Sequence, residues 1–132
     1  MRAAVVMVGA VVVAGIVVGV SAQQAGFKRT VLQQGDLSVA GREAVTAVAE
    51  FQPGATVGRH THPGEEIAYV LDGTIALEMD GKPKVTLGAG KTFLIPAGTV
   101  HNATNTGTGQ ARVLATYIVE KGKPLATPAA AK

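Results

Sequence analysis

Histidine is scarce in this chain, and its placement is the clearest chemical signal in the sequence. The 132 residues contain three histidines, His60, His62 and His101. The first two are two positions apart in a predicted strand, residues 56–62, so their side chains should point to the same face. Two neutral imidazoles gain nothing from each other, whereas a cation between them can bind both. Glu66 follows a Pro-Gly turn, and the next strand can bring its carboxylate back beside the pair.

Three imidazoles and one carboxylate make a ligand set of three nitrogens and one oxygen. This set suits first-row transition metals and is too rich in nitrogen for calcium or magnesium. Each part alone has a simpler interpretation, because histidines and carboxylates on strands are commonly solvated. Glu65 is an alternative carboxylate, and His101 alone would be an ordinary hydrogen-bonded residue of the core or rim. The metal hypothesis therefore depends on a fold that brings the four side chains together.

The elements that must position these side chains are predicted to be short β-strands. Turn signals such as Asp80-Gly81 recur closely, and the segments between them are rich in Val, Thr, Ile and Leu. These segments predict strands over residues 43–51, 74–79 and 111–119, and no capped helical periodicity interrupts them. We therefore predict an all-β domain over residues 23–120, folded as a sandwich or a single small β-barrel.

The two ends of the chain differ from its middle in composition. Residues 1–22 combine a positive start, an apolar run and small residues at the end. This arrangement is typical of a cleaved signal peptide, although the run is also close to the length of a membrane anchor. In either case we expect a periplasmic or secreted domain, which contacts the membrane only through the leader if the leader is uncleaved. Residues 121–132 are mostly Pro, Ala, Gly and Lys, and we expect this tail to be disordered.

Two motifs in the sequence resemble those of the cupin superfamily. The first runs over residues 54–73 and the second over residues 90–105. Every fixed position of the two motifs is matched at the required spacing: Gly54, His60, His62, Glu66, Gly73, Gly90, Pro96, Gly98, His101 and Asn105. The spacing selects Glu66 over Glu65 as the carboxylate of the first motif.

The resemblance implies a jelly-roll, or double-stranded β-helix, barrel that holds one divalent transition metal, either Fe, Mn, Cu, Ni, Co or Zn. By resemblance, the metal ligands are His60, His62, Glu66 and His101. Asn105 and the glycines of the motifs are assigned to the architecture of the barrel. The resemblance also implies a homodimer formed through outer strands, in which Ile67 and Tyr69 could contribute to the interface.

Composition excludes several other classes of function. The formal net charge is only +3, aromatic residues make up 4% of the chain and tryptophan is absent. We therefore expect no nucleic-acid partner. Cysteine is also absent, which excludes disulfides, thiolate metal sites and cysteine nucleophiles. After the leader there is one serine, Ser38, and no histidine would remain to activate it if all three bind a metal.

The sequence leaves three functions open for the metal site. The first is a metalloenzyme that oxidises or isomerises a small oxygenated organic molecule, with dioxygenase-type oxidation as the leading reaction. The second is a metal-dependent binding protein without turnover, and the third is a barrel that keeps the metal only for stability. No catalytic residue is assigned, and strand parity points Arg59 and Tyr69 away from the metal face. Residues that could line the site are Gln52, Glu78, Phe93 and Tyr117, although a packing or surface position is the simpler interpretation of each.

Overall fold

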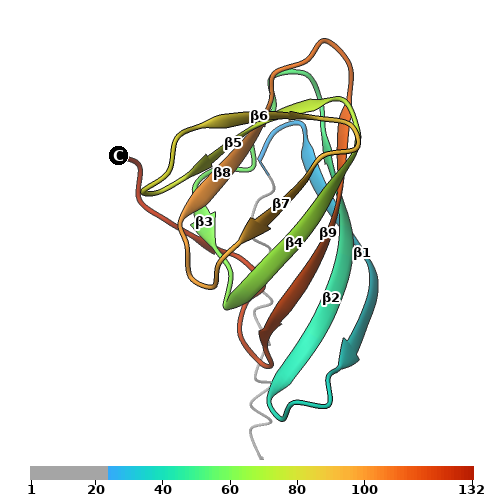
Figure 1. Ribbon diagram of the computed structural model, residues 1–132, viewed down its shortest axis with the longest axis vertical. Helices are drawn as coiled ribbons and strands as arrows, with labels where there is room; N and C mark the ends of the chain where they lie inside the picture. The colour runs from blue at the N-terminus through green and yellow to red at the C-terminus, as the bar shows by residue number, and fades with distance from the viewer. Residues whose placement is uncertain (1–23) are drawn as a thin grey trace, which may run out of the picture.

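The computed structural model describes residues 24–132, and this part of the chain is built from strands and turns (Figure 1). The strands are β1 (Phe27–Asp36), β2 (Arg42–Phe51), β3 (His60–Thr61), β4 (Gly64–Asp72), β5 (Thr74–Met79), β6 (Val85–Gly88), β7 (Thr92–Ile95), β8 (His101–Asn105), β9 (Ala111–Glu120) and β10 (Thr127–Pro128). Within the described range, no helix could span a membrane. The predicted signal peptide, residues 1–22, lies outside the described residues.

Two five-stranded antiparallel sheets make up the fold. One sheet has the order β1-β2-β9-β4-β7, and the other has the order β10-β3-β8-β5-β6. In Figure 1 the long strands of the first sheet run side by side, and the shorter strands of the second sheet lie across from them. Neighbouring strands are rarely consecutive in sequence, which is the crossing connection of a jelly roll. The predicted all-β fold is confirmed.

The core lies between the two sheets and follows the alternation of the longest strands. Strands β2 and β9 pair along their whole lengths, and in both of them every second side chain is buried. This period of two places one face of each strand inward. The buried face of β2 carries Val45, Ala47, Ala49 and Phe51. Ile75 of β5 and Ala103 of β8 join the same cluster from the other sheet, so burial of apolar surface binds the sheets together.

Several elements match their predicted ranges. The strands predicted over residues 43–51, 74–79 and 111–119 correspond to β2, β5 and β9. The predicted turn at Asp80-Gly81 joins β5 and β6, which pair as an antiparallel hairpin. Gly81 has a φ of 79° there, a conformation that costs glycine little because it has no Cβ.

The strand predicted over residues 56–62 is shorter than expected. Only His60 and Thr61 form β3, and Thr56 makes an isolated bridge to Thr104. Gly58 has a φ of 84°, which turns the backbone out of the extended conformation between the two segments. The bend limits β3 to two residues, which lie between β10 and β8 in the second sheet.

The tail, residues 121–132, is ordered in the structure, so the prediction of disorder was wrong. Thr127 and Pro128 form β10, which pairs with β3. The amide of Ala129 donates a hydrogen bond to the carbonyl of Arg59 at 2.9 Å. Leu125 packs against the hydrophobic core. The short strand β3 has an open edge, and the tail satisfies the backbone groups of that edge.

Candidate metal centre

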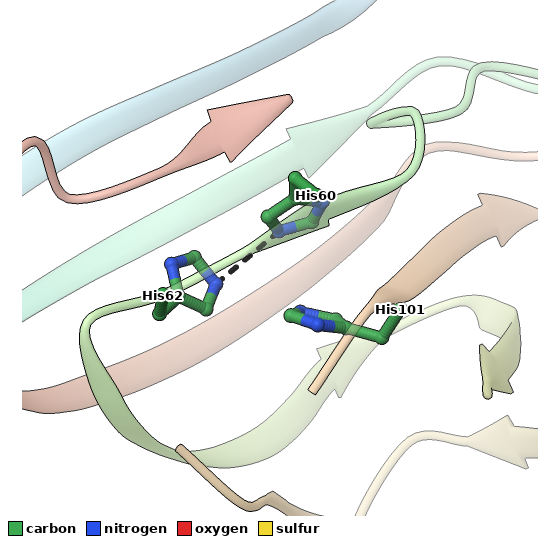
Figure 2. A group of neighbouring side chains, drawn as sticks. All are labelled: His60, His62 and His101. Carbon is green, nitrogen blue, oxygen red and sulfur yellow. Dashed lines mark hydrogen bonds between the residues drawn. The ribbon is translucent and has the colours of Figure 1, made fainter. Parts of the chain in front are cut away.

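The three histidines and Glu66 come from three short stretches of chain at one end of the barrel. His60 opens β3, His101 opens β8, and these two residues are direct cross-strand partners. His62 follows the end of β3, and Glu66 is the third residue of β4. All four residues are buried, with exposed fractions between 3% and 7%. Figure 2 shows the three imidazole rings turned toward a common point.

The four predicted side chains meet at their tips. One ligand atom from each of the three histidines lies within 4.8 Å of the others. The Nε2 atoms of His60 and His62 are 3.2 Å apart. Glu66 Oε2 lies 3.0 Å from Nε2 of His62 and 3.2 Å from Nε2 of His101. The structure therefore brings together the set that the sequence singled out. The alternative carboxylate, Glu65, falls on the opposite face of β4 because neighbouring strand residues alternate.

The outer nitrogen of each imidazole is held by a backbone carbonyl. Nδ1 of His60 contacts the carbonyl of Gly58 at 2.7 Å, and Nδ1 of His101 contacts that of Thr99 at 2.9 Å. Nδ1 of His62 contacts the carbonyl of Leu125 at 2.6 Å. A carbonyl oxygen only accepts hydrogen bonds, so each Nδ1 must carry the proton and donate it. In the neutral tautomer, all three Nε2 atoms then present lone pairs to the shared point.

This tautomer makes the contacts at the centre unfavourable unless a positive charge is present. Two lone pairs 3.2 Å apart on His60 and His62 repel each other, and the carboxylate of Glu66 adds negative charge beside them. A proton on one Nε2 would relieve this repulsion, but it would create an imidazolium ion in a buried site. One metal cation satisfies all four groups together. The backbone-anchored Nδ1 atoms are also the usual support for metal-binding histidines, so these residues fit a metal.

The titration behaviour of the site is consistent with neutral imidazole and ionised carboxylate. Burial, together with the neighbouring His101, lowers the pKa of His60 to about 4. Burial disfavours the charged form of Glu66, but hydrogen bonds from His101 and His62, which these residues donate when their Nε2 atoms carry a proton in place of a metal, outweigh burial and lower its pKa to about 2. Near neutral pH these two groups are therefore in the protonation states that bind a metal.

A cavity of about 30 Å³ opens beside His60, Glu66 and His101. Apart from these ligands its lining is apolar except for Arg29 and Tyr117. This volume has room for one or two water molecules. The apolar remainder of the lining comprises Phe27, Ala49, Phe51, Val57, Ile75, Leu77, Phe93, Ala103 and Val113. A larger groove of about 360 Å³ adjoins the cavity.

Two of the four predicted lining residues, Phe93 and Tyr117, do face the cavity. Gln52 is exposed in the loop after β2, and Glu78 pairs with Lys84 at 3.0 Å on the outside of the barrel. Gln52 follows the end of its strand and Glu78 lies on the solvent face of β5, so both have the surface position that was the simpler interpretation of these residues. Burial raises the pKa of Tyr117 well above its usual value, so its hydroxyl stays protonated.

The outward orientations predicted by strand parity are confirmed. Arg59 points away from the metal centre and pairs with Asp80 at 2.9 Å. Ile67 and Tyr69 are 47% and 44% exposed. Arg29 of β1 is the charged lining residue that the sequence did not reveal, because a charged residue on an edge strand is ordinarily solvated.

Comparison with known proteins places this barrel in a family. Residues 47–117 match the family model described as Cupin domain. The HTH-type transcriptional regulator PuuR of Escherichia coli is 40% identical over 68 residues, which make up 51% of this chain and 36% of the regulator. Protein SchB of Streptomyces halstedii is 37% identical over 68 residues, which make up 51% of this chain and 49% of SchB. The chain therefore spans between a third and a half of the length of these curated relatives.

Solved structures show the same fold. A predicted oxalate decarboxylase of Thermotoga maritima is 30% identical, with a TM-score of 0.53, over 59% of this chain and 80% of that one. A recombinant oxalate oxidase in complex with glycolate is 25% identical, with a TM-score of 0.63, over 78% of this chain and 55% of that one. The family model covers more than half of the chain, including all four residues of the centre. The chain therefore belongs to the cupin family.

Proposed function

We propose that this protein is a mononuclear metalloenzyme that oxidises a small oxygenated organic molecule, with His60, His62, Glu66 and His101 as the metal ligands. One observation carries the proposal. Three Nε2 atoms and one carboxylate oxygen converge, while every Nδ1 is bonded to a backbone carbonyl. A cation at the shared point suits all of these contacts at once.

Four protein ligands leave about two positions open around an octahedral ion. A bound iron, manganese or copper ion would supply redox chemistry, and any divalent ion would supply Lewis-acid polarisation of a substrate oxygen. The chain's own residues would position the substrate and exclude water. Phe27, Phe51 and Phe93 close the cavity with apolar surface, and Tyr117 keeps a protonated hydroxyl that can donate a hydrogen bond.

The lining favours oxidation over acid–base catalysis. Acid–base enzymes need a titratable group within hydrogen-bond reach of the substrate proton. Glu66 is the one carboxylate that lines the cavity among the described residues, and the proposed ligand role occupies it. The likeness to an oxalate oxidase bound to glycolate, at 25% identity, supports an oxidation of a small oxygenated substrate.

Metal content tests the ligand assignment first. Elemental analysis of the purified protein should find about one transition-metal ion per chain. His60→Ala, His62→Ala and His101→Ala should each lose most of it, because three ligands hold an ion far less tightly than four. Thr61→Ala, a change beside two of these residues on the other face of β3, is the matched control and should retain the metal. Full metal occupancy in all three histidine variants would overturn the assignment.

Oxygen consumption tests the reaction. The protein, loaded in turn with iron, manganese and copper, should consume oxygen with at least one member of a panel of catechols, flavonols, diketones and small 2-hydroxy acids. His101→Ala should show no consumption above background. A fully metallated protein that consumes no oxygen with any of these substrates would count against oxidation and favour the second candidate.

The second candidate is a metal-dependent binding protein without turnover. It is favoured by the 40% identity to part of a transcriptional regulator, a protein that is not described as an enzyme. Equilibrium dialysis of metallated protein against the same panel would then show binding of a compound that leaves the protein chemically unchanged. Recovery of a modified compound would exclude this candidate for that ligand.

The proposal also places the mature protein outside the cytoplasm. Its support is the apolar leader over residues 1–22, which is typical of an exported chain. N-terminal sequencing of protein recovered from the exported fraction should begin at Gln23. A first residue of Met1 in a cytoplasmic fraction would contradict export.

A further inference from the structure

Arg29 is a charged side chain in the wall of the cavity, next to the proposed metal centre. It lies two residues after Phe27 on β1, so both side chains point to the same face of the strand. Their cross-strand partners on β2 are Phe51 and Ala49, and all four of these residues line the cavity. The guanidinium is thus directed into the barrel, although β1 is an edge strand whose later residues are exposed.

The surroundings of Arg29 support the charge only in part. Its Cζ lies 5.4 Å from the ring centre of Phe27 and 5.5 Å from that of Tyr117. Such cation–π contacts favour a positive charge, but the face of an aromatic ring does not accept hydrogen bonds from the N–H groups that lie in the guanidinium plane. The Nε atom is buried and lacks a hydrogen-bond partner in the part of the chain that the structure describes. A buried donor without an acceptor is unfavourable.

Arg29 also lacks a counter-charge. Arg59 and Arg112 on the outside of the barrel pair with Asp80 and Asp72. Among residues 24–132, no carboxylate forms an ion pair with Arg29. With a divalent cation held by neutral histidines and Glu66, the cavity would carry an excess of positive charge, and an anion entering it would be attracted by both the ion and the arginine.

We propose that Arg29 is a substrate-binding residue that holds the carboxylate of a small organic acid while an adjacent oxygen of that acid faces the metal centre. A guanidinium matches a carboxylate with two parallel hydrogen bonds, which would supply the acceptor that Nε lacks. The cavity has room for the reacting end of the ligand, and the rest would lie in the adjoining groove. This inference rests on the proposed metal function, because the second oxygen needs the metal as its partner.

The position of Arg29 also explains how such an acid would enter. Phe27, Arg29, Val57 and His60 line both the inner cavity and the larger groove of about 360 Å³. Arg29 therefore stands at the boundary between the two spaces. An anion drawn into the groove would meet Arg29 in its wall, and the guanidinium would retain it there in the orientation that directs its other end inward.

Binding measurements with matched ligands test the inference. Pyruvate and glycolate carry a carboxylate and an adjacent oxygen, and pyruvamide and glycolamide have the same shape without the charge. Isothermal titration would compare zinc-loaded wild type, Arg29→Gln and Arg29→Lys, with Arg112→Gln as the control that removes a surface arginine. Elemental analysis would establish that each variant holds the same amount of zinc.

The wild type should bind at least one of the two acids. Arg29→Gln should weaken that binding about 10- to 100-fold, the effect of losing hydrogen bonds to a charged group, and should leave the affinity for the amides unchanged. The affinity of Arg29→Lys for the acids should lie between those of the wild type and Arg29→Gln, because lysine keeps the positive charge but cannot form two parallel hydrogen bonds. Arg112→Gln should bind like the wild type. A purely structural role of Arg29 would weaken acids and amides equally, and that result would overturn the inference.

The remaining outcomes also decide the question. Wild-type protein that binds neither acid, or Arg29→Gln that binds them as tightly as the wild type, would overturn the inference. If Arg29→Gln does not fold, Arg29→Lys carries the comparison and must still weaken the acids selectively. If the wild type holds no metal, the proposed function fails, and the same titrations on metal-free protein judge Arg29 alone, because its preference for acids over amides needs no metal.

Discussion

Nδ1 of His62 lies 2.6 Å from the main-chain oxygen of Leu125, a residue of the C-terminal tail. The tail therefore helps to orient one of the four proposed metal ligands from 63 positions away in the sequence. Its strand β10 also pairs with β3 through Pro128 and His60. The segment that composition marks as disordered thus supports two histidines of the centre.

Removing the tail should weaken metal binding without unfolding the barrel. A chain that ends at Lys123 loses the carbonyl of Leu125 and all of β10. Most of the core cluster lies in the other sheet, which contains β2 and β9, and keeps its contacts. Loss of such an orienting partner typically lowers metal affinity about 10- to 100-fold, and competition with a chelator would measure it. A chain lacking only Ala131 and Lys132 is the control and should bind metal normally. Equal affinity in the two truncated chains would contradict the role of the tail.

The metal-free protein should become less stable as the pH is lowered, because His60 is buried in the folded chain. Its pKa is lowered from a usual value of 6.5 to about 4 by burial and by His101. Above pH 6.5 His60 is unprotonated in both the folded and the unfolded chain, so its titration does not change the free energy of unfolding. Below it, the unfolded chain takes up the proton first, and stability declines until the pH reaches about 4. The loss from pH 7 to pH 5 should be about 2 kcal/mol.

Urea unfolding of metal-free protein at several pH values would measure this loss. The interval from pH 7 to pH 5 lies above the titration of Glu66, whose pKa is lowered from 4.5 to about 2. Its contribution would therefore appear only at lower pH. His60→Gln removes this imidazole and should show a flatter profile. A wild-type free energy of unfolding that is constant from pH 7 to pH 5 would refute the prediction.

Gly64 should tolerate no side chain. A Cβ placed there would lie 1.9 Å from the carbonyl oxygen of Ile118 and 2.8 Å from Cα of Val119. Both contacts are with the backbone of β9, so Gly64→Ala must push β4 away from its neighbour and shift Glu66, two residues later. We expect a loss of about 3 kcal/mol or more in unfolding free energy, together with weaker metal binding.

Gly35→Ala on β1, where a Cβ meets open space, is the matched control and should change stability by less than about 0.5 kcal/mol. Similar stability of the two variants would show that the strands can separate at no cost.

Asn105 should contribute to folding rather than to chemistry. Its Nδ2 donates to the carbonyls of Phe51 and Gly109 at 3.0 and 2.8 Å, and its Oδ1 accepts from the amide of Gly107 at 2.9 Å. Asn105→Ala would leave these buried groups without partners at a cost of about 2 to 4 kcal/mol. The folded fraction should still hold one metal per chain. Asn102→Ala, which removes a bond from Thr56 in a less buried place, should cost about 1 kcal/mol. Thermal unfolding of the two variants would decide, and a loss of metal from fully folded Asn105→Ala would reassign this residue to the site.

The sequence by itself was sufficient for the fold class and for the composition of the centre. The strands β2, β5 and β9 are predictable because inward and outward side chains alternate along them, and this alternation can be recognised from residues that are adjacent in the sequence. His60, His62, Glu66 and His101 could be selected because their spacing between turns matches two known motifs. The architectural role of Asn105 followed from the same motifs and agrees with the three hydrogen bonds that its buried side chain makes.

Only the tertiary structure decided the surroundings of the centre. The tail has the composition of a disordered segment, but an open strand edge at β3 gives its backbone groups partners and so orders it. Arg29 has the local pattern of a solvated residue on an edge strand, but the curvature of the barrel brings its side chain beside Tyr117 and the cavity. Both outcomes depend on contacts between residues far apart in the chain, and local periodicity carries no information about such contacts.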